Sequence, residues 1–401
     1  MNVKLCIHNN KGRNMKKIVK ISLGVSIIIA STQNMYADTL AEAFEKGKVS
    51  GEIKSQYFQK EVANKKVSVW NNGGNLSYVT GDFYGFKSGV TLQAASVTAS
   101  DLDNAPTAYD KDQNVSGAVL SEAYLQYSIA NTTGKVGRQY ISTPLVEGSG
   151  SRMFKESFEG LVISNTDISN TTIVAAYVDK EQYRTKIASG GTEVKAVSDF
   201  EQVQDGAYTV YVNNKSVKNL TVDAQYALID SNTSSVDDTT AFYAAGSYNI
   251  NPFTIETQTY QTDNGNTSNS RGSAYAVNLL GNFDKLSLGA AYSTIAKDAN
   301  IVAGLGNGAD YLYTGPWIYG GVYDADTDAY KLSAGYKITT DLSFDLIYGA
   351  WKTASNPTAS ETDFMATYTF NKNFSTKLVF ATYDNLADES YRSRLYASYK
   401  F

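Results

Sequence analysis

Five charged side chains lie close together in the sequence between residues 138 and 156. They are Arg138, Glu147, Arg152, Lys155 and Glu156. Acidic and basic groups that face one another across a narrow passage create a transverse electric field, which orients charged solutes where water screens them poorly. Such a set steers ions rather than breaking covalent bonds. The chemistry requires strands and a loop that hold these groups at a constriction.

Histidine and cysteine are nearly absent, which limits the chemistry available elsewhere. Cys6 and His8 are the only residues of these types. Both precede the segment 15–37, which has the basic, apolar and polar parts of a secretory signal in that order. We expect residues 1–37 to be an N-terminal extension plus signal peptide, beginning at Met1 or Met15. We expect residues 38–401 to form one domain.

The charge of that domain also excludes some partners. Without residues 1–37 the chain loses six of its 35 basic residues and none of its 40 acidic residues, which leaves a net charge of −11. A charge of this sign argues against nucleic acid as a partner. Since residues 38–401 contain no His or Cys, imidazole or thiolate catalysis and zinc ligation are excluded there. We expect no enzyme.

Strict alternation of apolar and polar residues recurs along the chain. Tyr330, Leu332 and Tyr336, for example, alternate with Lys331 and Ser333, and a period of two is typical of a strand with two different environments. Eighteen segments fit this pattern: 48–58, 74–81, 83–99, 118–129, 132–140, 157–166, 170–179, 205–213, 218–229, 239–250, 252–262, 272–283, 284–296, 328–338, 341–352, 360–370, 373–383 and 390–401.

The connections between these segments indicate how the strands are arranged. Short turns such as Asn251-Pro252 alternate with longer polar stretches at 100–117, 180–204 and 297–327. This rhythm is typical of an outer-membrane barrel with short periplasmic turns and long external loops. The alternative, a secreted β-sandwich, gives no reason for the alternation of lengths. The sequence therefore predicts an all-β fold, a transmembrane antiparallel β-barrel of about 18 strands.

The last strand supports the same prediction. In 393–401 one face is apolar and includes Tyr399 and Phe401, while the other is basic and polar. We expect the apolar face to point outward and Phe401, with Tyr399, to act as the signal for the barrel assembly machinery.

In a barrel of this size, residues 141–156 would be the third external loop. Eighteen strands enclose a wide, water-filled lumen, so a loop must fold into it to make it selective. Arg138 has a difficulty, since alternation puts it on the same face as Val136 and it needs a bulge to point inward. Solvated loop arginines, or arginines that contact lipopolysaccharide phosphates, are the alternative.

The expected lumen face of the strands adds charges of both signs, which predicts a weak net ion preference. These predicted pore-lining residues are Glu52, Lys54, Glu122, Asp223, Lys331, Lys337, Asp345, Asp363, Lys377, Arg392 and Arg394.

Three stretches resemble the OprD-type porins and the related major porins of epsilonproteobacteria. They are LAEAFEKGKVSGEIKSQYF (40–58) with GGNLSYVTGDFYGFKSGV (73–90), residues 120–161 from LSEAYLQYSI to SFEGL, and GNGADYLYTGPWIYGG (306–321) before DTDAYKLSAGY (326–336). The resemblance implies an eighteen-stranded porin of the Gram-negative outer membrane, with an inward third loop and a basic ladder on one wall.

The resemblance also implies a function and partners. It implies passive diffusion of small polar or ionic solutes, Arg138 and Arg152 in the basic wall, and a homotrimer among outer-membrane lipid and lipopolysaccharide. No cofactor is expected, although porins of this kind hold calcium in some cases. Asp324–Asp328 does not complete an EF-hand loop. A structural or adhesive barrel, whose external loops bind a partner, is the alternative function.

Overall fold

The computed structural model describes residues 37–401 except 104–112, 188–193, 196–198, 233–236, 266–270, 310–311, 319–322, 355–356 and 387–388. The expected signal segment therefore lies almost entirely outside the described residues. The chain begins there with a short helix, α1 (Leu40–Glu45), whose N-cap Thr39 accepts a hydrogen bond from the Glu42 amide. In the described part of the chain, no helix is both long and apolar enough to cross a membrane.

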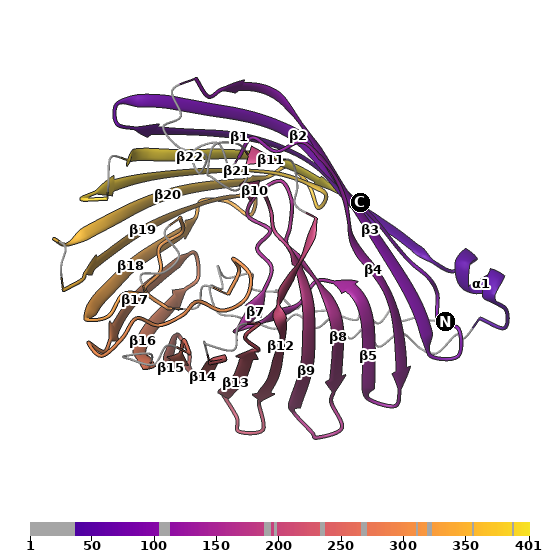
Figure 1. The fold of residues 1–401 in the computed structure, drawn as a ribbon. Coiled ribbons are helices and arrows are strands. Elements are labelled where there is room, and N and C mark those ends of the chain that lie inside the picture. Colours follow the sequence, from indigo (N-terminus) through magenta and orange to yellow (C-terminus); the bar gives the residue numbers. More distant parts are fainter. Residues whose placement is uncertain are drawn as a thin grey trace, which may run out of the picture.

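Eighteen antiparallel strands form one closed sheet, as the sequence predicted. Each strand pairs with its neighbours in chain order, and the first pairs with the last, so the sheet closes into a barrel (Figure 1). The strands are β1 (Lys48–Val62), β2 (Lys65–Val79), β3 (Phe86–Asp101), β4 (Gly117–Ile129), β5 (Thr132–Gln139), β8 (Ser157–Asn165), β9 (Thr171–Gln182), β12 (Phe200–Asn214), β13 (Leu220–Ile229), β14 (Thr239–Ile250), β15 (Phe253–Asp263), β16 (Arg271–Phe283), β17 (Leu286–Ile295), β18 (Thr327–Lys337), β19 (Leu342–Lys352), β20 (Ala359–Thr369), β21 (Phe374–Asp384) and β22 (Glu389–Lys400).

Two small two-stranded ribbons lie in the long connections. β6 (Ser142–Thr143) pairs with β7 (Val146–Glu147), and β10 (Lys186–Ile187) pairs with β11 (Val194–Lys195). The barrel has a turn end, where most connections are short, and a loop end, where the long connections emerge. The β14–β15 turn at Asn251-Pro252 is at the turn end, as expected.

One connection at the loop end differs from the expectation. β2 begins at Lys65 rather than near residue 74, and only Ala63 and Asn64 separate it from β1. Both turn residues have positive φ, as a tight hairpin turn requires. Asn71, Asn72, Gly73 and Gly74 are poor strand formers and hide the strand in the sequence, but pairing with β1 and β3 keeps them in the sheet.

The alternation along each strand separates an apolar outer face from a mixed inner face. On β18, Tyr330, Leu332 and Tyr336 are 44%, 55% and 50% exposed, whereas Lys331 between them is 7% exposed. Aromatic rings pair on the outer face near both ends of the barrel, for instance Phe253 with Phe283 at the turn end and Tyr330 with Tyr348 at the loop end. An apolar band between aromatic girdles is what a lipid-facing surface requires.

Candidate functional site

The connection between β5 and β8, called here the inner loop (140–156), crosses the inside of the barrel. Near its start, the Leu145 amide donates to Oε1 of Gln225 on β13 at 2.8 Å. Further along, the Arg152 carbonyl accepts from Nζ of Lys54 on β1, and the Ser151 carbonyl accepts from the Tyr396 hydroxyl on β22 at 2.8 Å. β13 stands across the closed sheet from β1 and β22. The inner loop thus divides the lumen.

A second connection also lies inside, although the sequence reading treated it as an external polar loop. This second inner loop (296–326, described except for 310–311 and 319–322) follows β17 and runs inside the barrel (Figure 1). The Tyr313 amide donates to Gln258 on β15 at 2.8 Å, and the amides of Trp317 and Ile318 donate to carboxylates on β20. Its apolar residues Ile301, Leu312 and Tyr313 are buried, which explains why it leaves the solvent.

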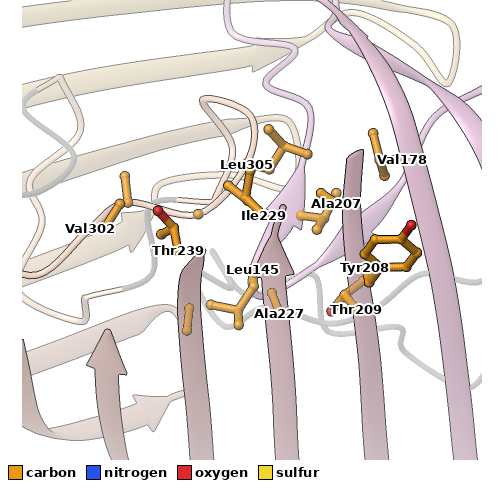
Figure 2. Close-up of a pocket in the computed structure, with 14 residues that line it drawn as sticks. Leu145, Val178, Ala207, Tyr208, Thr209, Ala227, Ile229, Thr239, Val302 and Leu305 are labelled. Carbon is orange, nitrogen blue, oxygen red and sulfur yellow. The ribbon is translucent and has the colours of Figure 1, made fainter. Parts of the chain in front are cut away.

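The two inner loops are attached to each other and to one side of the wall. Leu305 exchanges backbone hydrogen bonds with Leu145 and Glu147. Figure 2 shows that Leu145, Val302 and Leu305 of the two loops line one small space together with Ala207 of β12 and Ile229 of β13. The free space left there is about 20 Å³, enough for about one water molecule. This apolar region is an anchorage for the loops and not a ligand site.

Glu156 joins the two inner loops through hydrogen bonds. It has no exposed surface, and its carboxylate accepts hydrogen bonds from the amides of Ser149 and Asn307, both at 2.9 Å. The Asn307 side chain also donates to it, and Arg184 Nε lies 3.3 Å from Oε1. Because the carboxylate is enclosed, Glu156 does not face the passage, contrary to the sequence-based assignment to the constriction.

Opposite the anchorage, the inner loop leaves a polar passage along β1–β4. The free space there is about 380 Å³. It is lined by five residues that the sequence singled out, and all five are partly exposed: Glu52, Lys54, Glu122, Arg152 and Lys155. Acidic groups on β1 and β4 and basic groups on β1 and the inner loop thus surround one passage. This is the arrangement that produces a transverse field.

Two charged groups of the inner loop are perturbed by their surroundings. Burial raises the pKa of the Glu147 carboxyl, an effect that the Ser142 hydroxyl and Lys155 partly offset. Burial likewise lowers the pKa of Lys155, while Glu122 and Glu147 act in the opposite direction. Ser142 Oγ donates to Glu147 Oε1 at 2.9 Å, and the Lys155 ammonium lies 4.2 Å from the centre of the Tyr140 ring.

Arg138 does not belong to the passage. It has no bulge to turn it inward and stays on the outer face with Val136, where Nε donates to Glu159 at 2.9 Å. Lys180 reaches the other oxygen of Glu159 at 2.8 Å. The assignment of Arg138 to the basic wall is therefore corrected, since alternation along β5 continues through Gln139, whose buried side chain points inward.

The remaining predicted lumen residues lie on the inner face of their strands. Lys331 and Asp363 are buried under the second inner loop, and Arg392 and Arg394 are 6% and 5% exposed. Lys337, Asp345, Asp223 and Lys377 lie on the same inner face. On β22, Tyr399 and Phe401 are exposed on the outer face.

The residues through which the second inner loop contacts the wall are not among those predicted from the sequence. Gly315 to Ile318, a Gly-Pro-Trp-Ile segment, contact β18 and β20 and the cations of β21 and β22. A signal was present, because a Trp beside a Pro in a supposedly external polar loop is an unusual apolar group to leave in solvent.

Comparisons with known proteins agree with this architecture. A family model described as outer membrane porin, OprD family, matches residues 43–230. OccK3 (OpdO) of Pseudomonas aeruginosa is 18% identical, with a TM-score of 0.72 over 92% of this chain and 99% of that one. OccAB2 of Acinetobacter baumannii is also 18% identical, with a TM-score of 0.73 over 90% of this chain and 99% of that one. No curated protein matches the sequence.

Proposed function

Residues 43–230 belong to the OprD family of outer membrane porins, and from this premise we propose that solutes cross the barrel through the passage beside β1–β4. The protein is a diffusion channel of the Gram-negative outer membrane. In finer detail, we propose that the positive charges of Lys54, Arg152 and Lys155, together with the negative charges of Glu52 and Glu122, create an electric field across the passage. This field orients small polar or ionic solutes as they pass.

A single observation supports this proposal. The five side chains lie around one free space of about 380 Å³, whereas the anchorage on the far side is closed by apolar packing. A permeating ion therefore meets both signs of charge within one short stretch. Opposite charges at similar distances largely cancel for net selectivity but still orient a dipolar solute.

Conductance of the purified protein in a planar bilayer, measured at several salt gradients, tests the proposal. We expect steady open-channel currents with a small reversal potential, because both signs line the passage. Zwitterionic solutes should block or slow the current more than uncharged solutes of equal size. A strongly cation-selective channel would contradict the balanced passage. The alternative of an adhesive barrel is not favoured, since the inner loop and the described parts of the second inner loop lie inside the barrel.

Other features of the protein are part of the same proposal. We infer no catalytic activity, since residues 38–401 contain neither His nor Cys, and no required cofactor; the effect of a calcium chelator on barrel stability tests whether the protein holds structural calcium. The apolar outer face with its aromatic girdles supports contact with lipid and lipopolysaccharide. The outward Tyr399 and Phe401 support recognition by the barrel assembly machinery. A homotrimer is proposed by family resemblance, and cross-linking in native membranes tests it.

A further inference from the structure

Arg394 on β22 is a buried cation whose surroundings are unusual. It is 5% exposed, and its Nε has no hydrogen-bond partner among the described residues. The two groups packed over it are aromatic. Its guanidinium carbon lies 5.4 Å from the centre of the Trp317 ring and 6.0 Å from that of Phe58. A cation at such distances is attracted by the ring faces, though less strongly than by a carboxylate.

Trp317 also covers a second cation of the same wall. Nζ of Lys377 on β21 lies 4.7 Å from the centre of the same ring. The indole packs against Ile347, Met365 and Val379, which form a small apolar cluster on the inner wall. One side chain from the second inner loop therefore occupies the space in front of both cations.

The tip of the second inner loop is held in this place by main-chain atoms. The Gly315 carbonyl accepts from Lys331 Nζ at 3.0 Å. The Trp317 amide donates to Asp363 and the Ile318 amide to Glu361, both at 2.8 Å. None of these three bonds uses the indole, so truncation of Trp317 removes the cover and leaves the tip attached.

We propose that Trp317 is a specificity-determining residue, because its indole screens the charges of Arg394 and Lys377 from ions in the passage. The inference rests on the channel function above and concerns its ion selectivity. Without the indole, two positive charges face the lumen with no carboxylate in a salt bridge to either among the described residues. Anions then gain an attractive site that the wild-type protein hides.

The test compares Trp317→Ala with Trp317→Phe in planar bilayers under a salt gradient. We expect Trp317→Ala to shift the reversal potential toward anions, with an anion-to-cation permeability ratio raised about two- to tenfold, the range expected for partly screened charges. Trp317→Phe keeps an aromatic face and should shift the ratio much less. Adding Arg394→Gln and Lys377→Gln to the Trp317→Ala protein should abolish the shift.

The outcomes are separable. An unchanged reversal potential in a conducting Trp317→Ala channel, or a shift that persists after both cations are removed, overturns the screening role. A larger conductance with no change in selectivity also overturns it, because the indole would then act only as an obstacle. Absence of any conductance from the wild-type protein would instead count against the channel function. Heat-dependent gel mobility confirms that each variant is a folded barrel.

Discussion

The two charged sides of the lumen carry similar side chains, but these side chains differ in how much of their surface is exposed. Along β1–β4, Glu52, Lys54 and Glu122 are partly exposed and line the passage. Along β18–β22, Lys331 and Arg394 are 7% and 5% exposed and lie behind the second inner loop. The inward position of a charge on a strand therefore does not decide whether a solute meets it. The inner loops decide, by covering one wall and leaving the other open.

Among the variants that test how the inner loops cover one wall, Glu156→Gln is expected to have the largest effect. The change removes a buried charge beside Arg184 and weakens the hydrogen bond from the Asn307 amide. Loss of one partner from a buried ion pair typically costs about 3–5 kcal/mol, which should loosen both inner loops. Single-channel recordings should show higher and noisier conductance.

The control for that experiment is Glu159→Gln, which neutralises a carboxylate that pairs with Arg138 and Lys180 on the outer face. Its conductance should stay at the wild-type level. Equal noise in both variants would refute the role given to Glu156.

The second largest effect is expected on the open side of the lumen, along β1–β4. Replacing Arg152 and Lys155 together by Gln removes two positive charges from the passage, and the reversal potential should move toward cations. A tenfold change in permeability ratio requires only about 1.4 kcal/mol, and a unit charge about 4 Å from an ion contributes around 4 kcal/mol at an effective dielectric constant of about 20.

The matched control removes the same charge from the outer face, through Arg138→Gln with Lys180→Gln. Since both residues lie outside the lumen beside Glu159, the reversal potential should not move. A comparable shift in both double variants would mean that the passage is wrongly located.

A smaller effect is expected from pH. The raised pKa of Glu147 means that this carboxyl gains its proton at a higher pH than an ordinary Glu as the solution is acidified. Loss of that negative charge should move the reversal potential toward anions as the pH is lowered, and this should begin at a higher pH than for an ordinary Glu. In Glu147→Gln this part of the pH response should disappear, and its persistence would assign the response to another group.

The smallest effect is expected on the covered side. Lys331→Gln removes a charge that is enclosed and engaged with the Gly315 carbonyl, so the reversal potential should differ from wild type by less than that of the Arg152 and Lys155 variant. A shift as large as in that double variant would show that the second inner loop leaves this wall accessible.

The sequence predicted the barrel well because a period of two is a property of each strand alone. The number of strands and the outward face of Tyr330 or Tyr399 follow from local alternation and are confirmed. Lys54 and Glu122 lie beside the free space along β1–β4, and their inward position could be predicted because it depends only on the face of the strand that each occupies. The enclosure of Glu156 and the covering of Arg394 depend on contacts between distant segments, which no local pattern records. For Arg138, alternation along the strand predicted an outward side chain, whereas the family resemblance implied an inward one. The structure has the outward side chain.

The bond between Glu156 and Asn307 joins residues that are 151 positions apart in the chain. Contacts of such long range form late, because the entropy of closing the intervening segment must first be offset by the pairing of the strands within it. Strands β8 to β17 all lie in that interval. A newly closed barrel would then begin as a wide pore and become selective only when its two inner loops meet. The last stage of maturation would be a narrowing of the pore, and its rate would set how long a new channel leaks.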